Sequence, residues 1–293
     1  MSKKETHKVI NGDCCIEIPK ISKSVDLTFL DPPFNQDKDY ENHNDLMNED
    51  EYWSWMLDVC KMVFDKTTDG GAIYFMQREK NTHFIMETLE KAGWTFQNLI
   101  IWKKKTSAIP GKYRLSKSYQ SIVFSTKGKR PRVFNRLRID PTLLVTEKYK
   151  RKNGISLTDV WNDIRELTSG YFAGNEPFRT EDGQRFHKQQ SPNALLLRII
   201  LLSSKVGDTV LDPFGGTGTT PLVSLKTKRN SITIEKGKKN TTLIKKRLKS
   251  VRVEDDVEKY REDYYYTENL DTIFPKLSNP ITKKSNKQLD ILK

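Results

Sequence analysis

The sequence of 293 residues predicts an α/β fold in which helices cover both faces of a mostly parallel sheet. Short apolar, β-branched runs alternate along the chain with segments whose apolar residues recur at helical spacing. Two of these runs stop abruptly, one at a Pro-Pro turn and the other at a glycine-rich loop. The length suits one large α/β domain, or one domain with a modest insertion.

The first half of the chain contains strands and helices in alternation. Val25–Leu30 stops at two prolines, which predicts a buried strand followed by a rigid loop. From Asp50 to Phe64 apolar residues recur at helical spacing and predict an amphipathic helix. We further expect a strand at 72–76, a helix at 81–92 and strands at 96–102 and 121–125.

From about Lys127 to Phe186, charges, Gly and Pro interrupt short apolar pieces, so we expect an irregular insertion rather than core. Pro192 then opens an apolar helix through Leu202, since the first turn of a helix tolerates proline. The last elements expected are a strand at 208–211, a helix at 219–226, a strand at 231–235 and a basic helix at 238–250. Beyond Val251 the chain is polar, and we expect a loosely ordered extension.

The formal net charge is +13, and the basic residues are concentrated in one segment. Residues 100–152 contain sixteen Lys and Arg against two acids, an excess of fourteen, so the rest of the chain is nearly neutral. A localised cationic surface is what neutralisation of nucleic-acid phosphates requires. The charge therefore favours a nucleic acid as partner, although a basic protein without such a partner has the same composition.

The three cysteines, Cys14, Cys15 and Cys60, form no Cys-x-x-Cys pair and no His/Cys cluster with ligand spacing, so we expect no metal site. Their sparse number suits a reducing compartment. The N-terminal residues lack the apolar stretch of a signal peptide, and no run of about 18 apolar residues occurs. We expect a cytoplasmic protein with no membrane contact.

Residues 210–220 read VLDPFGGTGTT, an apolar strand, a glycine-rich turn and the start of a helix. Such a turn lets the backbone approach a ligand at the carboxyl ends of strands. A phosphate loop would need a Lys before its last Thr, and a dinucleotide loop a small residue where Pro221 stands. S-adenosylmethionine needs an acid for its amino group and one for its ribose, which Asp212 and Glu235 would supply. A tight turn without a ligand has the same local pattern.

Asp31-Pro32-Pro33-Phe34 follows the first predicted strand and has groups suited to binding an aromatic amine. The lone pair of such a nitrogen is delocalised into the ring, so the nitrogen is a poor nucleophile. The Asp31 carboxylate and the Pro32 carbonyl can accept its two hydrogens and draw it toward tetrahedral geometry, and the prolines fix that carbonyl. Phe34 offers a face for stacking of a base. Alone, the tetrapeptide is also an ordinary Pro-Pro turn.

The DPPF and FGGTG sequences together resemble the two signature motifs of amino-methylating DNA methyltransferases. Their order, with the basic segment between them, is similar to that of the permuted β-class, typified by bacterial restriction-modification systems. The resemblance covers most of residues 8–250. It implies a Rossmann-like, circularly permuted methyltransferase fold with an inserted target-recognition region. It also implies methyl transfer from S-adenosylmethionine to an amino group of a base in double-stranded DNA, in a prokaryotic cytoplasm.

The resemblance also assigns individual residues. Residues 11–14 (NGDC) are similar to an N-terminal motif whose acid, here Asp13, contacts the cofactor adenine. Residues 99–104 resemble the strand near the target base, and 187–192 the motif before the cofactor loop. Ser191 stands where the family often has Lys, and Tyr119-Gln120 where it often has His-Glu. The cofactor-binding residues implied are Asp13, Asp212, Phe214, Gly215, Gly216, Thr217, Gly218, Thr219 and Glu235.

Asp31 at the first position of the loop resembles adenine-N6 enzymes, whereas Ser is more usual there in cytosine-N4 enzymes, which stay the alternative. Cytosine-C5 enzymes normally carry their thiolate after a proline, and none of the cysteines follows one. A stacked base cannot reach the loop, so base flipping is implied. Two rivals come from other classes: an RNA or protein methyltransferase, and an inactive nucleic-acid-binding protein on this scaffold.

We divide the chain into four parts: 1–127 and 187–250, the catalytic and cofactor-binding halves of one domain; 128–186, a target-recognition insertion; and 251–293, an extension. Duplex DNA is the expected partner, held at its phosphates by the basic segment. A cognate restriction endonuclease and a second copy of the chain are further candidate partners. His43, Trp53 and Trp55, which follow the catalytic loop, are expected to pack in the core.

Overall fold

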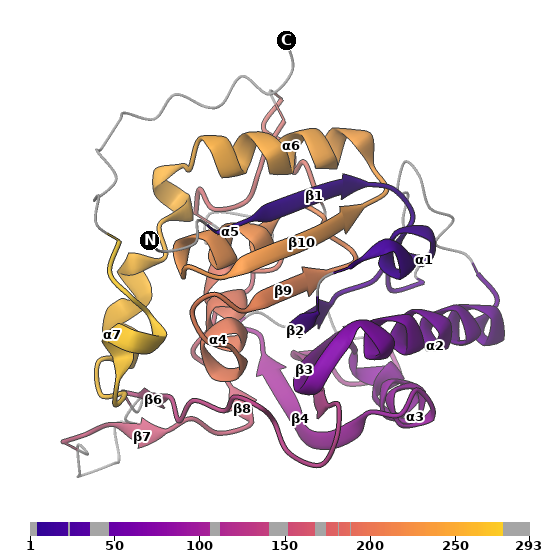
Figure 1. Ribbon diagram of the computed structural model, residues 1–293, viewed down its shortest axis with the longest axis horizontal. Helices are drawn as coiled ribbons and strands as arrows, with labels where there is room; N and C mark the ends of the chain where they lie inside the picture. Colours follow the sequence, from indigo (N-terminus) through magenta and orange to yellow (C-terminus); the bar gives the residue numbers. More distant parts are fainter. Residues whose placement is uncertain are drawn as a thin grey trace.

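An eight-stranded sheet lies at the centre of the computed structural model, which describes residues 5–22, 24–35, 47–105, 112–140, 152–167, 174–180, 182–187 and 189–277 (Figure 1). Neighbouring strands are parallel except at β5, which is antiparallel to both of its neighbours. The prediction of a mostly parallel α/β sheet is confirmed. In sheet order the strands are β1 (His7–Asn11), β10 (Asn230–Glu235), β9 (Thr209–Asp212), β2 (Val25–Leu30), β3 (Thr67–Arg78), β5 (Tyr119–Thr126), β4 (Thr95–Lys103) and β8 (Val160–Trp161).

Strands from the two ends of the chain interleave in this sheet. β9 and β10 lie between β1 and β2, and β9 pairs directly with β2, with Val210 opposite Leu27. From β9 the chain continues to β10, whereas from β2 it continues to β3 in the opposite direction across the sheet. Open α/β sheets bind ligands at the carboxyl ends of strands where the direction reverses. The topology thus places both predicted motifs at one ligand-binding edge.

Helices cover both faces of the sheet, as predicted. On one face α1 (Cys14–Glu17), α2 (Glu49–Lys66) and α3 (Thr82–Lys91) bury apolar side chains in one cluster with β2 and β3. On the other face α4 (Asn193–Ser203) packs with Tyr74 and Phe124. None of the described helices has the length and apolarity needed to cross a bilayer. The remaining helices are α5 (Thr219–Lys226) and α6 (Lys238–Lys249), beside β10, and α7 (Leu270–Ile273).

The long elements begin and end close to their predicted limits. Asn48 caps α2 by accepting a hydrogen bond from the Asp50 backbone N–H, and acidic side chains fill the first turn, as the helix dipole favours. β3 is longer than predicted because Gly70 and Gly71 do not break it. Gly70 has φ +72° and donates its N–H to the carbonyl of Lys127, so the ladder with the chain after β5 continues.

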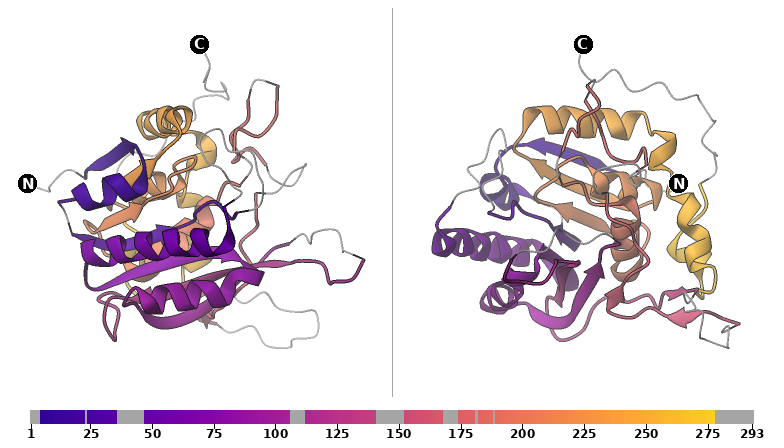
Figure 2. Two further views of the ribbon diagram at one scale, coloured as in Figure 1. Left: turned by 90° about the vertical axis from the view of Figure 1, so that its right-hand side faces the viewer. Right: turned by 180° about the vertical axis from the view of Figure 1, so that it is seen from behind.

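The expectation of a loosely ordered extension beyond residue 250 is wrong for the described residues 251–277. They form the 3-10 turns Val253–Asp255 and Glu258–Tyr264, followed by α7. Val257, Tyr264 and Phe274 are fully buried in the cluster that includes α4. In Figures 1 and 2 this segment (yellow) lies on the opposite side of the molecule from α2 and α3 (purple). A few buried apolar side chains therefore hold the segment on the core. The polar average composition of the segment gave no sign of them.

Two buried arginines on neighbouring helices also contact this segment. Arg247 of α6 and Asp255 are both fully buried and form an ion pair at 2.6 Å. Arg198 of α4 bonds the Tyr264 hydroxyl at 3.1 Å and forms a bidentate pair with Asp163. Buried charges are tolerated when they are paired and hydrogen-bonded, so polar composition did not require exposure here.

The described part of the insertion at 128–186 is irregular, as predicted, but it is not separate from the core. Its only regular elements are β6 (Arg138–Ile139), β7 (Ile155–Ser156) and β8, together with an isolated bridge between Arg179 and Arg185. Leu137, Trp161 and Ile164 are buried in the cluster that contains α4. The expectation that this region contributes no core is therefore wrong for these three residues, which a weak periodicity concealed.

Among the residues that the structure describes in 100–152, the basic side chains do not form one surface, contrary to the expectation from the sequence. β5 runs the full length of the neighbouring strand β4. The residues before it and the residues after it therefore lie at opposite ends of the strands, about 25 Å apart for eight residues. Beyond β5, Lys127 donates to the carbonyl of Thr67 at 2.9 Å, and Arg132 forms ion pairs with Asp26 and Asp208. The basic side chains that lie toward the carboxyl ends of β2 and β9 are Lys103, Lys104, Lys105, Lys112, Arg114 and Lys117.

Candidate active site

Four acidic residues lie where four parallel strands end. Asp31 follows β2, Asp212 ends β9, Glu235 ends β10, and Asp13 comes shortly after β1. All four line one cavity of about 400 Å³. The parallel pairing of the strands thus brings predicted catalytic and cofactor-binding residues from both ends of the chain to one place.

The loop that begins at Asp31 rests on two buried polar side chains. Tyr52 donates its hydroxyl proton to the Pro33 carbonyl at 2.8 Å, and Gln77 donates its amide N–H to the Tyr52 oxygen at 2.9 Å. Tyr52 is 1% and Gln77 0% exposed. Asp31, Pro32 and Pro33 line the cavity, so the loop presents its polar atoms from a fixed support.

Two aromatic residues, Phe34 and Trp55, differ in whether they reach the cavity. Phe34 is only 3% exposed and is not part of the cavity wall, so its ring offers no stacking face there. Trp55 packs against the core, as predicted, and it also lines the cavity, where it meets Phe214 edge-on at 5.7 Å between ring centroids. Helical spacing predicted the core packing of Trp55 but not its place at the cavity, because one side of α2 faces both the core and the cavity.

The other two aromatic expectations have different outcomes. Trp53 stacks on Phe84 of α3 at 5.0 Å between centroids and packs against the core, as predicted. His43 lies outside the described residues.

The Asp31 carboxyl accepts a hydrogen bond from the Ser191 hydroxyl at 2.9 Å. Burial raises the pKa of Asp31 to about 7; the bond from Ser191 opposes that rise, the charge of Asp212 adds to it, and Lys104 opposes it. Near neutral pH the carboxyl is therefore divided between its protonated and ionised forms. Only the ionised form accepts hydrogen bonds at both oxygens without donating one.

Asp212 closes the turn that follows β9. Its Oδ1 accepts from the Phe214 backbone N–H at 3.0 Å. Burial raises the pKa of Asp212 to about 6, and hydrogen bonds from Thr220 and Phe214 oppose the rise. A cationic ligand group beside this carboxylate would stabilise its ionised form.

Two glycines of the turn have different tasks. Gly216 has φ +52°, and a Cβ there would meet no atom closer than 3.9 Å, so its backbone faces the open cavity. Gly218 has φ +80°, and a Cβ there would come within 2.9 Å of Ile244. Gly218 is not part of the cavity wall, unlike the predicted residues Gly215, Thr217 and Thr219. The structure thus assigns Gly218 to helix packing rather than to ligand contact.

Glu235 binds both the glycine turn and the start of α6. Its Oε2 accepts from Gly216 N–H at 2.8 Å, and its Oε1 accepts from Gly237 N–H at 2.7 Å and from the Asn240 amide at 3.3 Å. Burial raises the pKa of Glu235, and these hydrogen bonds oppose that rise. Asn240 also lines the cavity and was not singled out from the sequence.

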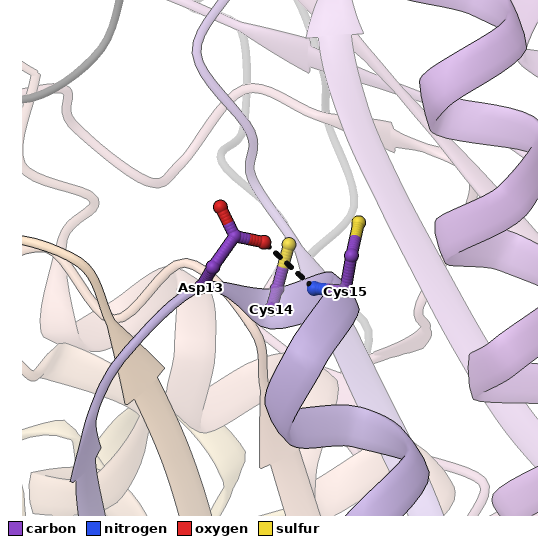
Figure 3. Close-up of side chains that lie close together, drawn as sticks. All are labelled: Asp13, Cys14 and Cys15. Atoms are coloured by element: carbon purple, nitrogen blue, oxygen red, sulfur yellow. Dashed lines mark hydrogen bonds between the residues drawn. The ribbon is translucent and has the colours of Figure 1, made fainter.

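Asp13 begins α1, and Figure 3 shows it beside Cys14 and Cys15. Its Oδ1 caps the helix by accepting from the Cys15 backbone N–H at 3.0 Å. The Cys15 sulfur accepts from the Trp55 indole N–H at 3.2 Å. A hydrogen bond from Cys14 lowers the pKa of the Cys15 thiol to about 7, with a smaller contribution from Trp55. The ligand atoms of the three residues lie within 4.8 Å of one another, but the carboxylate and the Cys15 sulfur already accept hydrogen bonds.

A further part of the cavity wall comes from the segment before α4. The sequence indicated only its last part, at 187–192, because the preceding residues have no diagnostic spacing. The His187 ring lies 3.9 Å from the position of a Cβ on Gly216, so this wall approaches the glycine turn closely. The residues that line the cavity from this segment are Thr180, Arg185, Phe186, His187, Gln189, Gln190 and Ser191.

These residues fit S-adenosylmethionine. The space beside the Gly216 backbone admits a ligand against the turn. Asp212 at the end of β9 could bind an amino group of that ligand, and Glu235 at the end of β10 could bind its hydroxyls. The cavity has the size and mixed character of a small-molecule site. The arrangement can therefore hold a nucleoside-type ligand with a cationic amine, next to the Asp31 loop.

Comparisons with known proteins agree with this geometry. Residues 25–246 match the model of the DNA methylase family N6_N4_Mtase. The Type II methyltransferase M.HinfI of Haemophilus influenzae is 29% identical over an alignment of 264 positions that covers 83% of this chain and 68% of that protein. The DNA adenine methyltransferase YhdJ of Escherichia coli (strain K12) is 29% identical over a gapped alignment of 300 positions that covers 96% of this chain and 92% of that protein.

A solved structure supports the fold. The crystal structure of the M1.HpyAVI–SAM complex aligns with a TM-score of 0.57 and 22% identity, over 84% of this chain and all of that chain. The family match covers both the Asp31 loop and the glycine turn. The chain thus belongs to the family of N6- and N4-methylating DNA methylases, whose methyl donor is S-adenosylmethionine.

Proposed function

We propose that this protein transfers a methyl group from S-adenosylmethionine to the N6 amino group of an adenine that is flipped out of a specific site in duplex DNA. The observation that carries the proposal is that Asp31 lines the same cavity as Asp212 and Glu235, so that amine and cofactor can meet in one space. An aspartate at the first position of the loop, here Asp31, resembles the residue found in adenine-N6 enzymes. YhdJ, which is 29% identical to this chain, is named as a DNA adenine methyltransferase. Cytosine-N4 methylation stays the alternative.

Methyl transfer requires mainly that the amino nitrogen is correctly placed relative to the methyl group. When bound, S-adenosylmethionine supplies a methyl group already activated on a sulfonium. The ionised Asp31 accepts one hydrogen of the amino group and the Pro32 carbonyl accepts the other, which restores the lone pair on nitrogen. As nitrogen gains the methyl group it loses a proton, and Asp31, with a pKa of about 7, is suited to accept it. The fixed loop holds both acceptors before the base arrives.

Each acid near the cofactor has a separate proposed role. Asp212 would bind the amino group of the methionine part, and Glu235 the two ribose hydroxyls, since each ends a strand at the cavity. Asp13 would contact the adenine. The turn around Gly215, Gly216 and Thr217, with Phe214 and Thr219, would enclose the ligand. Glu235 can accept from the ribose because carboxylate oxygens have several lone pairs, of which backbone N–H groups use only some.

The DNA would lie across the carboxyl edge of the parallel strands. Lys103, Lys105, Lys112 and Arg114 are exposed on this side and can neutralise phosphates. The insertion at 128–186 would read base edges, and a cognate endonuclease and a second copy of the chain stay candidate partners. The proposed division into 1–127, 128–186, 187–250 and 251–293 follows these tasks.

The proposed function is tested with purified protein and tritium-labelled S-adenosylmethionine. We expect label in unmethylated duplex DNA and none in RNA of the same sequence. Asp31→Ala should abolish transfer while cofactor binding by calorimetry persists, because Asp31 touches the base rather than the cofactor. The exposed Asp65→Ala on α2 is the matched control and should transfer normally. Unchanged turnover in Asp31→Ala, or label in RNA alone, would sink the proposal.

A further inference from the structure

Arg247 joins two segments that meet at the active site. Its guanidinium is fully buried and paired with Asp255. The same group donates to the carbonyl of Thr217 at 3.0 Å, in the glycine turn, and to Oδ1 of Asn193 at 3.1 Å, at the start of α4. A planar guanidinium with five N–H donors fixes the geometry of the groups it joins. The glycine turn and the start of α4 are therefore held in one arrangement.

A short series of hydrogen bonds leads from this arrangement to the catalytic carboxyl. Arg247 also reaches Thr219 Oγ1 at 3.4 Å, and the Thr219 hydroxyl donates to the Ser191 carbonyl at 3.1 Å. The Ser191 hydroxyl then donates to Oδ2 of Asp31 at 2.9 Å. Pro192 restricts the backbone of Ser191 to extended conformations, which further fixes the direction of that hydroxyl.

We propose that Ser191 is a positioning residue for Asp31 and that Thr219 and Arg247 hold Ser191 in place against the glycine turn. This inference rests on the proposed role of Asp31 as the acceptor of the amino group. A bond to Oδ2 leaves Oδ1 available to the substrate and restricts rotation of the carboxyl. Ser191 acts through Asp31 and is assigned no contact with the base.

Ser191 also influences when Asp31 is ionised. Burial raises the pKa of Asp31, and the hydrogen bond from Ser191 opposes that rise. Removal of the hydroxyl should therefore move the acid limb of the rate profile to higher pH, by about one unit for a hydrogen bond to a charged group. The loss of orientation should lower the plateau at high pH by roughly tenfold.

The test compares Ser191→Ala, Ser191→Thr and Ser224→Ala in the full chain. Ser224 is a buried serine of α5 whose hydroxyl donates to Thr220 O within its own helix at 2.8 Å, so it is the matched control. Single-turnover methylation of unmethylated genomic DNA is measured from acidic to alkaline pH. Cofactor affinity is measured by calorimetry, and folding by thermal melting.

In Ser191→Ala we expect the acid limb to shift to higher pH and the plateau to fall. Ser191→Thr should restore the wild-type profile, and Ser224→Ala should not change it. Cofactor affinity and melting should be unchanged in all three. A wild-type profile for Ser191→Ala, or the same shift in Ser224→Ala, would overturn the inference. The Asp31→Ala experiment separates the two claims: if that variant is inactive while Ser191→Ala is normal, only the role of Ser191 fails.

Discussion

Glu235 accepts the backbone N–H of Gly216 at 2.8 Å, so a side chain at the end of β10 holds the turn that follows β9. The ends of two neighbouring strands are thus joined directly at the cavity. Its other oxygen accepts from Gly237 at the start of α6. Glu235 therefore holds the glycine turn against the start of α6. It also lines the cavity, at the proposed ribose position.

Replacement of Glu235 by Gln should weaken cofactor binding by about tenfold to a hundredfold, because an amide has one acceptor oxygen and no charge for the ribose hydroxyls. Calorimetry with S-adenosylmethionine measures the effect. Glu90→Gln, an exposed change on α3, should bind like the wild type. Equal affinity in the two variants would remove Glu235 from the cofactor site.

Methyl transfer should fall as the pH decreases through about 7, because Asp31 must be ionised to accept the amino hydrogens and its pKa is raised to about 7 by burial. The rate should be nearly constant above that range. Single-turnover rates at saturating DNA and cofactor report the step directly. A rate that stays constant down to pH 5 would contradict the raised pKa or the role of Asp31.

Asp31→Asn should stabilise the protein at alkaline pH although it removes activity. The folded pKa of about 7 lies above the unfolded value, so ionisation of the wild-type carboxyl costs stability that increases as the pH rises from about 4 to 7. We expect the variant to gain about 1 to 3 kcal/mol at pH 8.5 and little at pH 4. Thermal melting at both pH values checks this, and a lower stability at pH 8.5 would refute it.

Tyr52→Phe should slow methyl transfer about tenfold, because the Pro33 carbonyl loses its donor and the loop loses its support. Gln77 would also lose an acceptor for its buried amide, at a cost of about 1 to 3 kcal/mol in unfolding free energy. Turnover and chemical denaturation measure the two effects. Tyr265→Phe, at an exposed position, is the control and should change neither.

A chain that ends at Ser250 should lose stability and cofactor binding relative to the full chain. The shorter chain lacks Asp255, which leaves the buried Arg247 without its carboxylate and costs about 3 to 5 kcal/mol. It also uncovers the apolar cluster that Tyr264 and Phe274 complete. Soluble yield, melting and calorimetry compare the two chains. A stable, cofactor-binding shorter chain would show that the packing of residues 251–277 on the core is dispensable.

Much of the fold could be predicted because strong local patterns agree with the tertiary structure. The strand before Asp31 and the strand before the glycine turn have simple apolar sequences between clear stop signals. The segment at 251–277 could not be predicted in the same way. Its anchors, such as Tyr264 and Phe274, are separated by charged residues, and its buried Asp255 is stabilised by a partner on α6.

The site could be predicted where acidic residues stand at the ends of strands. It could not be predicted where side chains from distant segments contact those acids. Asp31, Asp212 and Glu235 each follow or end a strand, so their convergence follows from a parallel sheet. Ser191 looked only like a departure from a family pattern, and its bond to Asp31 depends on how α4 packs. The basic segment misled for a related reason, since charge along a chain does not tell at which edge of a sheet each residue lies.

The central claim is that the modified atom is N6 of adenine. Mass spectrometry of nucleosides, from duplex DNA methylated by the purified protein and S-adenosylmethionine, tests it most directly, with Asp31→Ala as the blank. We predict N6-methyladenine in the wild-type reaction and no methylated nucleoside in the blank. N4-methylcytosine in place of N6-methyladenine would contradict the claim.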